Sequence, residues 1–217
     1  MEFLSHDDKL LALEAEKWDE GFSFVAGVDE VGRGPLAGPV VAAAVVFPLG
    51  SKIPRVDDSK KLTAAKRDAL RQAIIEVPGV QYAIVELSHE IVDEINILRA
   101  SQLAMRRAVE QLKQVDFLLV DGLPVPNLPV ANLAIVKGDS KSASIAAASI
   151  LAKEYRDGLM IKLAKKFPGY GFEKHKGYGT KQHLKALQEL GVCQIHRRSF
   201  APVRAIIEPP PEQLELW

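Results

Sequence analysis

Short apolar runs alternate with amphipathic segments along this chain. Five of the runs have the length of a strand and are bounded by turn residues, which predicts strands over residues 22–29, 38–47, 80–87, 116–121 and 133–137. The second run, Gly-Pro-Val-Val-Ala-Ala-Ala-Val-Val-Phe, has no polar alternation. This uniformity indicates a strand that is buried on both faces of a sheet.

Helical patterns lie before, between and after these runs. Leu4, Leu11 and Trp18 recur among acids, which predicts an amphipathic helix over residues 1–20. Further helices are predicted over residues 63–76, over 88–113 in two pieces, and over 140–157, with mainly helical structure after that. This order of elements predicts an α/β fold with a mixed sheet and a C-terminal helical extension.

Composition narrows the class of protein. A length of 217 residues with 47% hydrophobic residues suits one domain, or one domain with an appendage. The single cysteine, Cys193, excludes a disulfide within the chain and favours a reducing compartment. No apolar run has the length of a membrane span, and the N-terminus is acidic and unlike a signal peptide. We therefore expect a cytoplasmic protein, with nothing that demands more than a monomer.

Charge is distributed unevenly although the net charge is zero. Residues 137–204 contain 14 Lys and Arg against 5 Asp and Glu, so the rest of the chain is acidic. Such asymmetry suggests a polyanionic partner for the basic part. A solvated basic face is the equally simple alternative.

Four acids occur where predicted strands end. Asp29 and Glu30 end the first strand, Asp121 ends the fourth, and Asp139 follows the fifth. Each alone has an ordinary structural explanation, as a solvated strand end, a turn residue or a helix cap. Together they can converge, because the ends of neighbouring strands lie close in space.

Clustered carboxylates repel one another unless a cation neutralises them. Oxygen ligands select Mg²⁺ or Mn²⁺, and two such ions support in-line attack of water on a phosphodiester. One difficulty is geometric, because adjacent residues of a regular strand point to opposite faces. Asp29 and Glu30 share a site only if the strand breaks there, as Gly32 and Gly34 allow, or if Glu30 reaches round the edge.

The segment Gly27-Val28-Asp29-Glu30-Val31-Gly32-Arg33-Gly34-Pro35 resembles the opening signature of bacterial ribonuclease HII, a type 2 ribonuclease H. Further matching motifs follow in the family's order, namely Asp58-Ser59-Lys60-Lys61-Leu62, Val120-Asp121-Gly122, Lys137-Gly138-Asp139-Ser140-Lys141-Ser142 and His175-Lys176-Gly177-Tyr178-Gly179-Thr180. The resemblance covers residues 23 to about 204. We accordingly expect a helical extension over 1–20, a catalytic domain over 21–204 and a tail over 205–217.

The resemblance implies a ribonuclease H-like mixed five-stranded sheet flanked by helices. It implies an endoribonuclease that hydrolyses the RNA strand of RNA–DNA hybrids and cuts 5′ of ribonucleotides embedded in duplex DNA. The family's four catalytic, metal-binding acids match Asp29, Glu30, Asp121 and Asp139, which would hold Mg²⁺ or Mn²⁺.

The resemblance also implies a substrate loop. The family's Gly-Arg-Gly segment, which contacts the 2′-hydroxyl of the ribonucleotide, matches Gly32, Arg33 and Gly34. Glycines let the backbone approach a ligand closely, and the 2′-hydroxyl distinguishes RNA from DNA. The family's tyrosine, which packs on the sugar at the RNA–DNA junction, matches Tyr178. Without the resemblance, a tight turn and a structural tyrosine would explain these residues equally well.

Three lysines and one serine within the motifs are candidates for phosphate contacts. They are Lys60, Ser140, Lys141 and Lys176, of which Ser140 and Lys141 are expected to open a helix whose N-terminus attracts phosphate. We assign no histidine as a general base, and we expect His175, His183 and His196 at the surface.

The last five residues, Gln213–Trp217, resemble the short peptide by which bacterial replication and repair proteins bind the sliding clamp. Trp217 departs from the usual final Phe. A tail that folds back on the domain is the alternative.

Two other functions compete with a ribonuclease. A non-catalytic nucleic-acid-binding protein would use the basic half for affinity and would need no divalent ion. A nucleotide-phosphate enzyme would use the Gly-Arg-Gly turn as a phosphate loop, but no Gly-Lys-Ser/Thr follows. Metal-dependent cleavage separates the first alternative from the ribonuclease.

Overall fold

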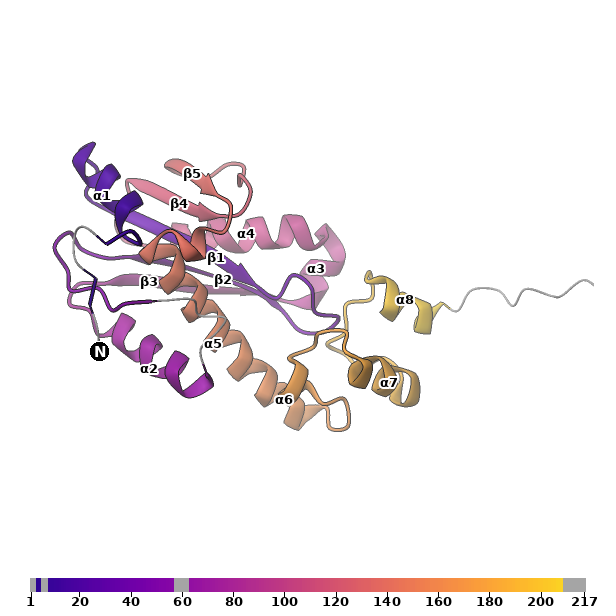
Figure 1. Ribbon diagram of the computed structural model, residues 1–217. Helices are drawn as coiled ribbons and strands as arrows, with labels where there is room; N and C mark the ends of the chain where they lie inside the picture. The colour runs from indigo at the N-terminus through magenta and orange to yellow at the C-terminus, as the bar shows by residue number, and fades with distance from the viewer. Residues whose placement is uncertain (1–2, 5–7, 57–62, 209–217) are drawn as a thin grey trace, which may run out of the picture.

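A computed structural model of the chain describes residues 3–4, 8–56 and 63–208. A five-stranded sheet in the order β3-β2-β1-β4-β5 lies at its centre (Figure 1). The strands are β1 (Val25–Val31), β2 (Val40–Val46), β3 (Gln81–Leu87), β4 (Phe117–Asp121) and β5 (Ala131–Ile135). β2 is antiparallel to β1 and β3, whereas β1, β4 and β5 are parallel, so the predicted mixed sheet is confirmed. Two strands are displaced from their predicted ranges: β1 begins three residues and ends two residues later than predicted, and β5 lies two residues closer to the N-terminus.

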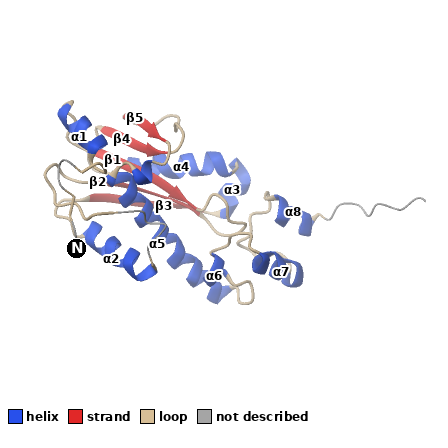
Figure 2. Ribbon diagram, viewed as in Figure 1, coloured by secondary structure: helices blue, strands red, loops and turns tan. Residues whose placement is uncertain are grey.

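β2 separates two apolar cores, as its uniform apolar sequence predicts. Its even-numbered residues pack with helix α4 (Ile97–Glu110), and its odd-numbered residues pack with α5 (Ala143–Lys166). The two helices therefore cover opposite faces of the sheet (Figure 2). The alanines of β2 and α5 let the long α5 helix lie close to β1 and β2.

Local capping chemistry explains several helix boundaries. Thr63 caps α2 (Ala64–Ile75) by accepting a hydrogen bond from the backbone N–H of Lys66. The predicted helical segment 88–113 forms α3 (His89–Ile95) and α4, separated by Asn96 at φ +65°. The predicted division into two pieces is thus confirmed. None of the helices in the described ranges is long and apolar enough to cross a membrane.

The N-terminal helix α1 (Ala12–Asp19) is shorter than the predicted 1–20 and caps α5. Buried Glu14 accepts hydrogen bonds from the Ser142 hydroxyl at 2.5 Å and from the Ser144 backbone N–H at 2.9 Å. Because α5 begins at Ala143 with Ser142 as its N-cap, the prediction that Ser140 and Lys141 open this helix is wrong. Glu14 already occupies the helix N-terminus that was expected to attract phosphate.

The remaining helices lie beyond the carboxyl end of β1 (Figure 1). They are α6 (Phe172–His175), α7 (Lys181–Leu190) and α8 (Ala201–Ile207). A small core joins α6 and α7, and α8 packs on α7 through Val203 and Leu187. In the small core His183 and His196 are buried beside the Phe172 ring, while His175 is half-buried. The prediction of surface histidines is therefore wrong, because these imidazoles satisfy one another and nearby backbone groups.

Candidate active site

The predicted acids gather where two parallel strands end. β1 pairs with β4 up to Val28 opposite Val120, so Asp29 and Asp121 are next in register. Beyond this point β1 continues to Val31 and pairs only with β2. Open sheets place ligand sites at the carboxyl ends of parallel strands, and here the shorter β4 leaves the side of β1 free.

Asp29 is the most buried of these acids. Its side chain is 6% exposed, accepts a hydrogen bond from the Ser149 side chain on α5, and accepts the Glu30 backbone N–H at 2.7 Å. Burial raises the pKa of the Asp29 carboxyl well above its usual range, and the charges of Glu30 and Asp121 raise it further. These effects show that three carboxylates lie close together.

Glu30 lies on the same strand without a break in it. β1 is regular through Val31, and the backbone turns only at Gly32, with φ +95°. Glu30 accepts an ion-paired hydrogen bond from Arg33 at 3.1 Å, which opposes the rise in its pKa that burial causes. Asp29 and Glu30 nevertheless line one cavity, so Glu30 reaches it round the open side of β1.

Asp121 is fixed by the segment that carries Asp139. The Gly138 backbone N–H donates to Asp121 Oδ1 at 2.6 Å, and half-buried Asp139 is the next residue, in the short 3-10 helix η2 (Gly138–Ser140). Asp139 does not line the cavity. Within the described ranges, no three Asp, Glu, His or Cys side chains are already arranged to hold a metal ion by themselves.

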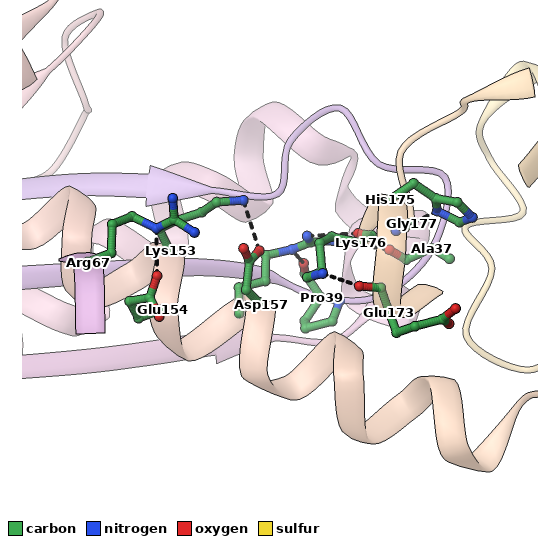
Figure 3. Close-up of polar contacts among 11 residues, drawn as sticks. Ala37, Pro39, Arg67, Lys153, Glu154, Asp157, Glu173, His175, Lys176 and Gly177 are labelled. Carbon is green, nitrogen blue, oxygen red and sulfur yellow. Dashed lines mark hydrogen bonds and ion pairs between the residues drawn. The ribbon is translucent and has the colours of Figure 1, made fainter. Parts of the chain in front are cut away.

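The cavity has a volume of about 480 Å³ and combines acids with bases. Besides Asp29, Glu30 and Asp121, it is lined by residues 31–34, Arg67, Ser149, Lys153 and Tyr178. Arg67 pairs with Glu154 at 2.6 Å, and Lys153 pairs with Asp157 at 2.8 Å (Figure 3). The sequence analysis missed Arg67, Ser149 and Lys153. The available signal was the spacing of Ser149 and Lys153, which are four residues apart and share one face of a helix.

The predicted substrate loop and tyrosine meet at this cavity. Tyr178 is 41% exposed, and a Cβ added to Gly34 would lie 3.5 Å from the tyrosine ring. A Cβ on Gly177 would lie only 2.5 Å from the Ala37 carbonyl oxygen. Glycine is therefore required at residue 177 for the two loops to pack.

The predicted phosphate contacts are not gathered at the cavity. Ser140 and Lys141 are exposed and do not line it. Lys176 donates its ammonium group to the Glu173 carbonyl (Figure 3). Lys60 lies outside the described residues, as does Gln213–Trp217.

Comparison with known proteins agrees with this geometry. The family model described as Ribonuclease HII matches residues 26–203. A relative named Ribonuclease HII from Chlamydia caviae is 53% identical over 213 residues, covering 95% of this chain and 100% of the relative.

Solved structures give the same fold. Ribonuclease H2 from Pyrococcus horikoshii OT3 is 27% identical with a TM-score of 0.68, covering 84% of this chain and 96% of that chain. A structure described as the PCNA:RNase HII complex from Archaeoglobus fulgidus gives 24% identity and a TM-score of 0.67, covering 80% and 93%. These likenesses confirm the ribonuclease H-like fold. With the family model matching most of the chain, the protein belongs to the ribonuclease HII family, a family of hydrolytic nucleases.

Proposed function

We propose that this protein is a metal-dependent endoribonuclease that hydrolyses the RNA strand of RNA–DNA hybrids and cuts 5′ of ribonucleotides embedded in duplex DNA. The products are a 3′-hydroxyl and a 5′-phosphate. One observation carries the proposal. Three mutually repelling carboxylates face the same cavity as the Gly32–Gly34 backbone and the Tyr178 ring. Family membership and fold support endoribonuclease activity on hybrids.

The donor set suits a hard divalent cation. Asp29 is buried beside the charges of Glu30 and Asp121, and a cation would relieve the repulsion that raises its pKa. Carboxylate oxygens favour Mg²⁺ or Mn²⁺, and Mg²⁺ commonly keeps waters and substrate phosphates among its ligands. An incomplete protein shell therefore fits this ion. We assign Asp29, Glu30, Asp121 and Asp139 as its ligands; two bound ions would activate water and stabilise the leaving oxygen.

The protein's own contacts hold these ligands in place. Asp29 accepts hydrogen bonds from Ser149 and from the Glu30 backbone N–H, and Asp121 Oδ1 accepts one from the Gly138 N–H. These hydrogen bonds orient the two carboxylates, as donors behind metal ligands do. Arg33 holds Glu30 at the mouth of the Gly-Arg-Gly turn. The geometry thus ties the acid cluster directly to the loop that would read the sugar.

Substrate recognition divides into two parts. Gly34 lies against the exposed Tyr178 ring, so a sugar that stacks on the ring passes the loop backbone, where a 2′-hydroxyl can be recognised. Phosphate contacts supply affinity, for which we retain Lys60, Ser140, Lys141 and Lys176 as candidates. Binding of a sliding clamp through Gln213–Trp217, a monomeric state and a cytoplasmic location stay predictions.

The test is a labelled DNA duplex containing one ribonucleotide, incubated with Mg²⁺ or Mn²⁺ beside an all-DNA duplex. We expect metal-dependent cleavage 5′ of the ribonucleotide that is much faster than cleavage of the all-DNA duplex, and loss of cleavage in Asp121→Asn. The side-chain amide oxygen of this variant can still accept the Gly138 N–H, so the variant should fold. The control variant Asp68→Asn removes an exposed carboxylate on α2 and should cleave normally.

A folded wild-type protein that binds the duplex but cleaves it with neither ion would favour the non-catalytic nucleic-acid-binding protein. Cleavage that persists in Asp121→Asn would show that the Asp121 carboxylate is not needed for catalysis.

A further inference from the structure

Two arginines lie in the protein interior behind the loop that joins β1 to β2, residues 32–39. Arg156 comes from α5 and Arg197 from the segment before α8. Both side chains are fully buried. In the described part of the chain, neither guanidinium forms an ion pair; all of their side-chain hydrogen bonds go to backbone carbonyls.

Arg197 holds the Gly-Arg-Gly turn itself. Its Nη2 donates to the Gly32 carbonyl at 2.6 Å, and its Nη1 donates to the Arg33 carbonyl at 3.1 Å. Its Nε donates to the Gly38 carbonyl at 3.0 Å, at the far end of the same loop. One planar group therefore fixes both ends of the loop relative to each other.

Arg156 joins this loop to the turn that carries Tyr178. Its Nε and Nη2 donate to the carbonyls of Pro39 and Ala37 at 2.9 and 3.2 Å, and its Nη1 donates to the Lys176 carbonyl at 3.0 Å. Figure 3 shows these three acceptor residues drawn together. A Cβ on Gly32 would lie 2.3 Å from Arg156 Nε, so the loop packs directly on the guanidinium.

This arrangement is unfavourable as a simple core. A buried cation without a carboxylate partner costs more than an apolar residue of the same size. Burial accordingly lowers the pKa of Arg156 to about 10 and that of Arg197 to about 9. A guanidinium, unlike a lysine ammonium group, presents its N–H donors in a rigid planar fork. This fork fixes the backbone of residues 32–39.

The fixed backbone has a consequence at the cavity. In a trans peptide the carbonyl and the following N–H point in opposite directions. Because Arg197 holds the carbonyls of Gly32 and Arg33, the N–H groups of Arg33 and Gly34 point away from it. Within the described ranges, neither N–H donates to a protein acceptor, and both residues line the cavity.

We propose that Arg156 and Arg197 are positioning residues for ribonucleotide selection. Arg197 aims the two free N–H donors of the turn at the 2′-oxygen, and Arg156 sets the distance between those donors and the Tyr178 ring. The inference rests on the proposed function and deepens it. Neither arginine touches the substrate.

The experiment uses Arg197→Lys and Arg156→Lys, which keep a positive charge and lose the fork. Cleavage is measured on matched duplexes with one ribonucleotide or one 2′-deoxynucleotide at the same position, in Mn²⁺. Misplacing a positioned group by about 1 Å costs on the order of 10²-fold in rate. We expect kcat on the ribonucleotide duplex to fall by about that factor, with KM little changed, and the ratio of ribonucleotide to deoxynucleotide cleavage to shrink.

The control variant Ile74→Ala removes a fully buried side chain on α2 that touches neither loop. It should lower stability and leave the cleavage ratio unchanged. Hydrogen exchange provides a readout in folded protein without turnover. The amides of Leu36 and Gly38, which donate to the Gly177 and Ile195 carbonyls, should exchange faster in the lysine variants, and those of β2 should not.

The outcomes separate the two proposals. Wild-type protein without ribonucleotide-dependent cleavage would overturn the proposed function and this inference with it. Wild-type cleavage with the ratio and loop exchange unchanged in both lysine variants would overturn the inference alone. Should Arg197→Lys fail to fold, the cleavage ratio and loop exchange of Arg156→Lys decide between these outcomes.

Discussion

His196 makes the stability of the C-terminal helical region depend on pH. Its side chain is 1% exposed, with Nε2 3.1 Å from His183 Nε2 and Nδ1 accepting the Cys193 backbone N–H at 3.0 Å. His183 Nδ1 lies 2.9 Å from the Tyr178 carbonyl. All these contacts are satisfied when His196 donates to His183 and His183 donates to Tyr178, with both rings neutral.

The size of the effect follows from the pKa of His196. Burial is the main cause that lowers this pKa from 6.5 to about 4, and the charges of His183 and His89 contribute in the same direction. The groups around the ring are Cys193, Tyr170 and these two histidines. Between pH 6.5 and 4 the unfolded chain binds more protons than the folded chain, so the free energy of unfolding falls as the pH falls. At pH 5 the loss is about 2 kcal/mol.

Urea unfolding of wild type and His196→Gln from pH 7.5 to 4.5 measures this loss. Asp29 and Glu14 have raised pKa values and oppose the trend, so the informative quantity is the difference between the two proteins. This difference should shrink by about 2 kcal/mol between pH 7.5 and 5. Val203→Ala, a core change without a titratable group, should keep a constant offset from wild type. A constant offset for His196→Gln as well would refute the reasoning.

Three further predictions concern the cavity and the tail. Asp29→Asn should abolish cleavage and raise the free energy of unfolding in metal-free buffer, because a buried, repelled carboxylate becomes neutral. Mg²⁺ or Mn²⁺ should raise the melting temperature of wild type and leave that of the variant unchanged. Gly32→Ala should impair folding, since its φ is +95° and a Cβ would meet Arg156, whereas Gly34→Ala should fold normally, as circular dichroism and melting would check. Deleting residues 213–217 should preserve cleavage and abolish clamp pull-down; an unchanged pull-down would contradict the assignment of the tail.

Local patterns predicted the sheet and three of the cavity acids well. Apolar runs identified the strands, and Asp29, Glu30 and Asp121 follow from where those runs stop. The sequence could not show how Asp29 and Glu30, which are adjacent on one strand, reach the same cavity. The answer depended on the relative lengths of β1 and β4, which only the pairing of the strands reveals.

Long-range contacts account for what the sequence did not reveal. Arg67 reaches the cavity only because α2 packs beside α5. Arg197 contacts carbonyls more than 150 residues away along the chain, and no local pattern marks such a partner. The burial of His183 and His196 was missed for the same reason, because an isolated imidazole in a polar segment carries no signal of burial. The start of α5 was misplaced because its buried acceptor, Glu14, comes from another helix.

Glu14 also constrains the order in which the helices and the sheet pack together during synthesis. Glu14 and its donor Ser144 are separated by 130 positions in the chain. Ribosomes add about 5–20 residues per second, so α1 emerges many seconds before its partner exists. Until then its carboxylate stays hydrated and ionised, and its apolar face has no α5 to cover. We therefore expect α1, although it is synthesised before the strands β1–β5, to dock only after the sheet has formed.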